Sequence, residues 1–216
     1  MSQLCPRTFE ASDKERLGVT QNKRKQKIVI CVAGMTGCGK STLARRLAKK
    51  YGLKYLSGGS MLKTLAKKMG YKSDKRGWWE SEEGMKFLQQ RAENSMFDKE
   101  VDKELMKWAK RGNVVFDSWT MSWLLKENAF KVWLEVLPEE RARRLARRDH
   151  ISVEEALKVL KEKDAKTKSI YKNLYGFNLG EDLSPFNLIL DTTELESDEV
   201  FQTLCMVIDR VVLGKS

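Results

Sequence analysis

The 216-residue chain is 41% hydrophobic and 33% charged, a balance typical of a globular domain with its own core. No apolar run approaches the roughly 18 residues that a membrane helix needs, and residues 1–27 lack the apolar stretch of a signal peptide. The formal net charge of +11 favours an anionic partner. Polyphosphate ligands fit this charge better than nucleic acid, because no aromatic-basic module or finger spacing accompanies it.

Residues 1–26 are polar, and we expect a flexible extension ahead of one folded domain at 27–216. The sequence argues against a zinc site, because no C-x-x-C pair exists and His150 is the single histidine. Cys31 and Cys205 lie in apolar patterns and should belong to the core. Free thiols fit a reducing compartment, so we expect a cytoplasmic protein, and we expect a monomer.

Strands and helices alternate along the chain. Continuous apolar runs predict buried strands at 27–33, 53–57, 113–117, 130–136 and 186–192. Helical patterns cover 40–52, 59–70, most of 71–111, 120–128, 138–173 and 196–214. Ser197 and the two acids after it mark the start of the last helix. This order predicts an α/β fold, a five-stranded parallel sheet with helices on both faces and ligands at the carboxyl ends of its strands.

Residues 34–41 fit the phosphate-binding pattern G-x-x-x-x-G-K-[ST], and they lie between a predicted strand and a predicted helix. Glycines let backbone N–H groups converge on phosphate oxygens. Lys40 would contact the outer phosphates, and the Ser41 hydroxyl would bind Mg²⁺. A glycine-rich turn with a surface lysine is the alternative. The pattern predicts a P-loop nucleotide site formed by Gly34, Met35, Thr36, Gly37, Cys38, Gly39, Lys40, Ser41 and Thr42.

Two further features suit phosphoryl transfer. Asp117 ends the third predicted strand at the same sheet edge, where it would help to hold Mg²⁺, unless it is only an exposed strand-end acid. Arg141, Arg144 and Arg148 share one face of a predicted helix. Because the transferring group is anionic, we predict that at least one of these arginines is catalytic; a solvated helix face is the alternative. We expect His150 to be exposed.

Other nucleotide-dependent classes lack their signatures here. No D-x-x-G follows Asp117 and no N-K-x-D is present, which disfavours a GTPase switch. The catalytic loop of protein kinases is also absent.

Four stretches carry a more specific resemblance: "LSGGSMLKTLAKKMG", "FDKEVDKELMKWAKRGNVVFDSWTMSWLL", "KVWLEVLPEERARRLARRDHISVEEAL" and "IYKNLYGFNLGEDLSPFNLILDTTELESDEV". With the P-loop, residues 28–213 resemble nucleoside monophosphate kinases, and within them the archaeal-type cytidylate kinases. The resemblance implies transfer of phosphate from ATP, with Mg²⁺, to CMP or dCMP. It also implies a P-loop NTPase fold with an acceptor-binding lobe at 57–112 and a lid at 138–175.

The resemblance also implies acceptor-side positions, which are Ser57, Lys63, Asp117, Trp119, Lys163 and Tyr171. Several depart from the family pattern. Lysine stands at 63 and 163 where the family has arginine, and lysine lacks the planar fork that grips phosphate. Trp119 and Ile170 also replace arginines, and asparagines replace the aspartates of the last two lid motifs, at Asn178 and Asn187.

These departures leave two other hypotheses open. One is a P-loop kinase or ATPase that acts on a different acceptor or on a protein or RNA partner. The other is a non-catalytic nucleotide-binding module, although the intact Lys40, Ser41 and Asp117 argue against it. Trp78, Trp79 and Trp108 belong either to the core of the acceptor lobe or to a different pocket wall.

Overall fold

Five parallel strands form the centre of the molecule, as the sequence predicts, and their order in the sheet is β2-β3-β1-β4-β5. The computed structural model describes residues 27–74, 77–126 and 129–215, so the predicted extension 1–26 and positions 127–128 of a predicted helix lie outside the described residues. The strands are β1 (Val29–Gly34), β2 (Lys54–Ser57), β3 (Val114–Asp117), β4 (Phe130–Glu135) and β5 (Leu188–Asp191).

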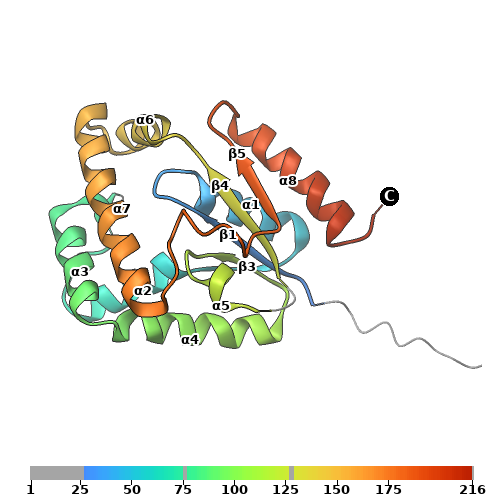
Figure 1. Ribbon diagram of the computed structural model, residues 1–216, viewed down its shortest axis with the longest axis horizontal. Coiled ribbons are helices and arrows are strands. Elements are labelled where there is room, and N and C mark those ends of the chain that lie inside the picture. Colours follow the sequence, from blue (N-terminus) through green and yellow to red (C-terminus); the bar gives the residue numbers. More distant parts are fainter. Residues whose placement is uncertain (1–26, 75–76, 127–128, 216) are drawn as a thin grey trace, which may run out of the picture.

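Helices follow the strands in alternation (Figure 1). They are α1 (Lys40–Tyr51), α2 (Gly58–Lys68), the 3₁₀ turn η2 (Trp78–Glu80), α3 (Glu82–Glu93), α4 (Met96–Arg111), α5 (Met121–Leu124), α6 (Pro138–Asp149), α7 (Val153–Tyr175) and α8 (Ser197–Val211). Within the described ranges, no helix has the length and apolar composition to cross a membrane.

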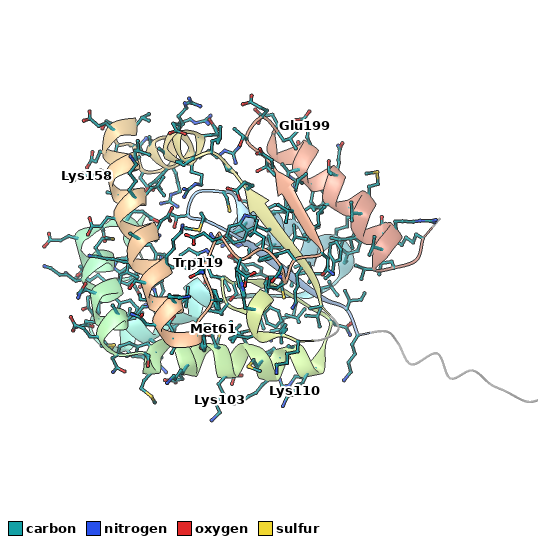
Figure 2. The ribbon with its side chains drawn as sticks, viewed as in Figure 1. Met61, Lys103, Lys110, Trp119, Lys158 and Glu199 are labelled. Atoms are coloured by element: carbon teal, nitrogen blue, oxygen red, sulfur yellow. The ribbon has the colours of Figure 1, made fainter. Side chains whose placement is uncertain are left out.

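Both faces of the sheet are covered, which explains why β1 is apolar at every position. Ile30 and Val32 pack with residues of α1 and α8, whereas Val29 and Cys31 pack with residues of α2, α4 and α5. The buried Cys205 of α8 belongs to the first cluster, as predicted. Lys103, Lys110 and Lys158 extend outward from α4 and α7, so part of the basic surplus is solvated surface (Figure 2).

The strand register brings the motif residues to one edge. Asp117, the last residue of β3, pairs with Ser57 at the end of β2 and with Val32, two residues before the end of β1. The P-loop, Asp117 and Ser57 therefore lie at the carboxyl edge of the sheet, where ligands bind in such folds.

The predicted helical stretch at 138–173 is a pair of helices that turns at His150. His150 is exposed, as expected, and has a left-handed backbone with φ of 58°. The Ser152 side chain then caps α7 by accepting from the backbone N–H of Glu155 at 3.1 Å. Ala142, Leu145 and Leu160 hold the two helices together in a small apolar cluster. We call these helices the α6–α7 pair.

The last helix begins at Ser197 and carries Asp198 and Glu199 in its first turn, as the sequence predicts. Its N-cap is Glu196, which forms a reciprocal capping box with Glu199. The Glu199 side chain accepts from the backbone N–H of Glu196 at 2.8 Å. A glutamate in this role has a weaker sequence signal than serine, which explains why the sequence did not reveal this cap.

Candidate active site

A cleft of about 650 Å³ opens at the carboxyl edge of the sheet. The P-loop and α1 form one wall, and the ends of β2 and β3 form the floor. The other walls come from α2, η2, α3 and α4 on one side and from the α6–α7 pair on the other. Most of the residues that the sequence singled out line this cleft, although they come from six segments of the chain.

The P-loop divides into residues that face the cleft and residues that lie beneath it. Thr36, Gly37, Gly39, Lys40, Ser41 and Thr42 line the cleft. Gly34, Met35 and Cys38 do not, since Met35 and Cys38 pack into buried apolar clusters. A Cβ on Gly34 would lie 2.6 Å from Cys38 Sγ and 2.7 Å from the Leu134 carbonyl oxygen, so only glycine fits at the start of the loop.

The side chains of Lys40 and Trp119 lie next to each other beside the P-loop. The Lys40 ammonium donates to the Met35 carbonyl at 3.4 Å and lies 5.1 Å from the centre of the Trp119 ring. The Trp119 indole N–H donates to the Gly34 carbonyl at 2.7 Å, and the side chain points into the interior (Figure 2). Trp119 therefore lines the cleft as an aromatic neighbour of the P-loop lysine.

Asp117 and Ser41 supply the donor set expected for magnesium. The Asp117 carboxylate is buried, and its Oδ2 accepts from the Tyr55 hydroxyl at 2.8 Å. Burial, with the Asp117 charge as the second cause, raises the pKa of Tyr55 to about 12, so this phenol remains a donor. No group of three or more His, Cys, Asp or Glu that suits a metal occurs among the described residues. One carboxylate and one hydroxyl fit Mg²⁺, which completes its shell with water and phosphate oxygens.

The three arginines of α6 that the sequence singled out differ in what they face. Arg144 and Arg148 line the cleft. Arg144 donates from Nε to Glu140 at 3.1 Å and from a terminal nitrogen to the Thr192 carbonyl at 2.9 Å.

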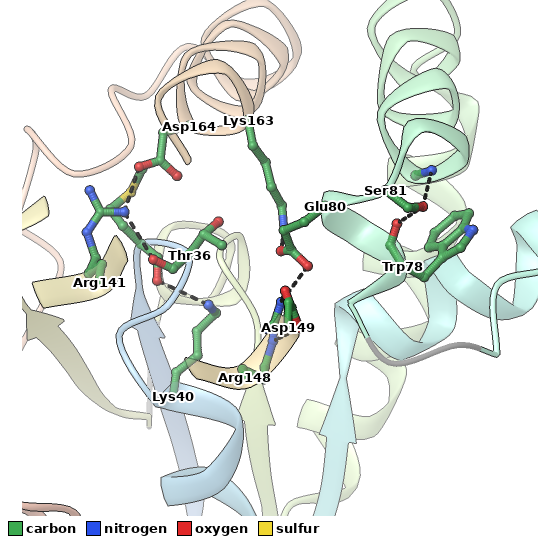
Figure 3. A network of polar contacts seen from close by, with 12 residues as sticks. Thr36, Lys40, Trp78, Glu80, Ser81, Arg141, Arg148, Asp149, Lys163 and Asp164 are labelled. Carbon is green, nitrogen blue, oxygen red and sulfur yellow. Dashed lines mark hydrogen bonds and ion pairs between the residues drawn. The ribbon is translucent and has the colours of Figure 1, made fainter. Parts of the chain in front are cut away.

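Arg141 is not brought into the cleft, in contrast to the sequence expectation. Its guanidinium is buried, donates to the Thr36 carbonyl at 3.0 Å and pairs with Asp164 of α7 at 2.7 Å (Figure 3). Arg141 therefore connects the α6–α7 pair to the P-loop. The sequence predicted that Arg141 and Arg148 share a helix face, but it did not reveal that, of these two, only Arg148 lines the cleft.

A buried carboxylate joins two cations across the cleft. Glu80 of η2 accepts from Arg148 at 2.6 Å and from the Lys163 ammonium (Figure 3). Arg148 is also paired with Asp149 at 2.6 Å. Burial is the largest influence on Lys163 and lowers its pKa, whereas the Glu80 charge raises it. Sequence reasoning found both cations and missed Glu80, which lies in the charged segment after Trp78 and Trp79.

Two further acids and an arginine line the cleft on its α3–α4 side, and sequence reasoning missed them. Arg91 makes a two-point ion pair with Asp98, at 3.1 and 2.7 Å, and also donates to the Tyr171 hydroxyl at 3.2 Å. Asp102 accepts from the hydroxyls of Thr120 at 2.5 Å and Tyr175 at 2.6 Å. The sequence offered one signal for this group: Asp98 and Asp102 are four residues apart and share a helix face with the apolar Val101 and Leu105.

The remaining acceptor-side positions are also accounted for. Ser57 lines the cleft and caps α2 by accepting from the Ser60 N–H at 3.2 Å, and Lys63 lies one turn further along the cleft wall. Ile170 is buried beside Tyr171 in an aromatic cluster. Asn187 accepts from the Lys131 backbone N–H at 2.8 Å, away from the cleft.

The tryptophans of the segment 71–111 are mainly core. Trp78 is fully buried and packs 4.9 Å from Trp79, ring centre to ring centre, whereas Trp108 is half-buried at the edge of the same cluster. Trp79 also lines the cleft, so it belongs to both the core and the pocket wall.

The parallel sheet, the phosphate loop between β1 and α1 and the acid at the end of β3 define a P-loop NTPase fold. The chain belongs to the cytidylate kinase-like family, which matches residues 29–194. The cytidylate kinase of Pyrococcus horikoshii is 35% identical over 87% of this chain and 91% of its own length. That of Methanocaldococcus jannaschii is 31% identical over 85% of this chain and 99% of its own. These relatives do not favour an unrelated acceptor.

Solved structures agree in fold. A shikimate kinase from Bacteroides thetaiotaomicron is similar with a TM-score of 0.52, at 17% identity over 86% of this chain and 98% of that one. The protein TT1252 from Thermus thermophilus also has a TM-score of 0.52, with 21% identity, and the match covers 87% of this chain and 99% of that one. At these identities the likeness concerns the P-loop kinase architecture alone.

Proposed function

We propose that this protein transfers the γ-phosphoryl group of ATP to CMP or dCMP, with Mg²⁺, and releases ADP and the diphosphate. One observation carries the proposal: a single cleft of about 650 Å³ extends from the P-loop to polar residues of α2, α3 and α4. An ATPase needs room only for water beside its nucleotide. A cleft that continues beyond the P-loop in this way suits a second substrate, and the curated relatives named above are cytidylate kinases.

The donor half would use the P-loop. Backbone N–H groups and the N-terminus of α1 would bind the phosphates of ATP, and Lys40 would turn from the Met35 carbonyl to the outer phosphates. Ser41 and Asp117 would hold magnesium, which when bound neutralises charge on the phosphate oxygens.

The transfer itself would depend on Arg144, Arg148 and Lys163, which line the cleft between donor and acceptor. Their charges would stabilise the anionic phosphoryl group in the transition state, which is the main requirement of this reaction. A general base is unnecessary, because the acceptor phosphate is already an anion. Arg141, held outside the cleft, would act only by fixing the α6–α7 pair against the loop.

The acceptor half would bind the monophosphate through Ser57 and Lys63, with Trp119 and Tyr171 as aromatic walls. The α3–α4 side of the cleft favours cytosine over uracil. Asp98 and Asp102 offer carboxylate oxygens, which accept from the amino group of cytosine and repel the carbonyl oxygen that uracil presents there. Because a site built for one hydrogen-bonding pattern leaves polar groups unpaired with the other, we expect discrimination of about 10² or more.

Segments 57–112 and 138–175 would act as acceptor lobe and lid that close over the substrates and keep water from the phosphoryl group. Lysines at 63 and 163 keep the charge of the arginines found in the family pattern but hold phosphate at one point instead of two. Slower turnover than in relatives with both arginines is therefore expected.

A coupled ADP-release assay tests the proposal. Purified protein, Mg²⁺ and ATP are combined with CMP, dCMP, UMP, AMP, GMP, dTMP or no acceptor. We expect ADP release well above the no-acceptor background with CMP or dCMP alone. A flat panel, or equal rates with UMP, would contradict the assignment of the acceptor.

A further inference from the structure

Glu80 is one of the acids that line the cleft, and its carboxylate contacts two of the cations there, Arg148 and Lys163. Its side chain is only 7% exposed, and it comes from η2, on the acceptor side. Lys40, Lys63, Arg148 and Lys163 line the cleft around it, on four different helices. A buried carboxylate close to the path of an anion is electrostatically unfavourable, so its position requires an explanation.

The contacts of Glu80 supply that explanation. One carboxylate oxygen accepts from Lys163 of α7, and the other accepts from Arg148 of α6 at 2.6 Å (Figure 3). Lys163 is itself only 6% exposed, so its ammonium group depends on a counterion for its charge. Arg148 has a second partner in Asp149, whereas Lys163 forms an ion pair with Glu80 and with no other acid among the described residues.

We propose that Glu80 is a positioning residue for phosphoryl transfer, which holds Lys163 charged and, with Arg148, aimed at the phosphate path from the acceptor side of the cleft. The inference rests on the proposed function and deepens it. Cations held in place before the substrates arrive need no reorganisation during the reaction. Because η2 belongs to the acceptor side and the cations to the α6–α7 pair, one carboxylate also fixes these two parts of the cleft relative to each other.

The charges that act on Lys163 come from three elements. Glu80 on η2 raises its pKa, whereas burial, Lys40 on α1 and Arg148 on α6 lower it. Removing the Glu80 charge leaves only the lowering influences. Lys163 would then lose its proton at a lower pH, and the alkaline limb of the activity profile would move in the same direction.

The variant Glu80→Gln tests this directly, with Glu82→Gln as the matched control, since Glu82 is exposed and pairs with Lys86 in the next turn of α3. We expect Glu80→Gln to lower kcat at least about tenfold and to shift the alkaline limb to lower pH, with little change in the KM for ATP. The control should keep the wild-type profile. Faster turnover or tighter ATP binding in Glu80→Gln would mean that the carboxylate obstructs the anion, and would overturn the inference.

Loss of folding is separated from loss of positioning by a second variant. Glu80→Gln leaves a buried lysine without its partner and should lower Tm, whereas Glu80→Gln combined with Lys163→Met removes both charges and should restore Tm. The double variant should stay at least as slow as Glu80→Gln. Recovery of kcat together with Tm would show that Glu80 serves stability alone, and would overturn the inference.

A readout without activity separates this inference from the proposed function. In protein labelled with ¹³C-lysine, Lys163→Met identifies the Lys163 signal, and its titration gives the pKa of the ammonium group. We expect that pKa to fall in Glu80→Gln. An unchanged titration would overturn the inference even if CMP is the substrate, whereas a flat acceptor panel with a shifted titration would overturn only the proposed function.

Discussion

Among single residues, Lys40 is the side chain on which the proposed ATP site depends most. Its ammonium group lies between the Met35 carbonyl and the Trp119 ring and forms no ion pair within the part of the chain that the structure describes, so it is available to an incoming phosphate. We expect Lys40→Ala to lower kcat by about 10² or more, because a preorganised charge at the reacting phosphate is lost. Lys49→Ala, at an exposed position of the same helix, is the control in the ADP-release assay. An active Lys40→Ala enzyme would show that the donor phosphates bind elsewhere.

Asp102 gives the α3–α4 side of the cleft a pH dependence. Burial raises its pKa from an ordinary 3.8 to about 6, although hydrogen bonds from Thr120 and Tyr175 oppose the shift. The folded state therefore binds more protons than the unfolded state between about pH 4 and 6, and this carboxyl makes the protein less stable as pH rises through that window.

The variant Asp102→Asn removes this titration while it keeps the shape of the side chain. We expect its stability relative to wild type to improve between about pH 4 and 7, by an amount on the order of 2 kcal/mol. Urea unfolding at several pH values measures the difference. A difference that stays constant with pH would show that Asp102 is not the group that titrates.

Single residues also show where sequence reasoning ends. The P-loop and Asp117 were predictable, because the motif is local and the end of a buried strand fixes its place at the sheet edge. Arg141 and Arg148 share residue type and helix face, and only the distant partners Asp164 and Glu80 separate their surroundings. These partners are 23 and 68 positions away along the chain, and such contacts leave no periodic signal in one sequence.

At the scale of elements, the five strands and the main helices were predictable from apolar runs, and the sequence did not reveal details that side chains outside the periodic pattern decide. The left-handed His150 divides one predicted helical stretch, and the Glu196–Glu199 capping box begins α8. The segment 71–111 is broken at η2, which packs beneath α3 through Trp78 and Phe87. The aromatic residues of this segment indicated that it contributes to a core, but they did not predict the 3₁₀ turn η2.

The contact between η2 and α3 gives an element-scale prediction. A Cβ on Gly84 of α3 would lie 2.0 Å from the Trp78 carbonyl oxygen, which is backbone and cannot rotate away. Gly84→Ala should therefore destabilise the protein by about 1–3 kcal/mol, although alanine ordinarily stabilises a helix. Gly59→Ala is the control in thermal unfolding, because its nearest neighbour would be 3.7 Å away. Equal Tm values for both variants would contradict this packing.

The charge of the whole molecule adds a kinetic expectation. A net charge of +11 and a cleft lined by several lysines and arginines should attract anionic nucleotides over long distances. We expect kcat/KM for ATP and for CMP to fall on the order of tenfold between about 50 and 500 mM NaCl. Doubling the coupling enzymes at each salt concentration controls for effects on the assay. A rate that is independent of salt would show that the charge serves a surface unrelated to the cleft.

The buried pair between Arg141 and Asp164 has a mechanical consequence. The ion pair itself joins α6 to α7, whereas the bond from Arg141 to the Thr36 carbonyl joins the α6–α7 pair to the P-loop. A swing of both helices away from the loop would keep the ion pair but leave a buried carbonyl without its charged donor, at a cost on the order of 1–3 kcal/mol. Movement of the lid in this chain is therefore expected to be coupled to the backbone that binds the donor phosphates, so that the binding of ATP and the position of the lid would influence each other.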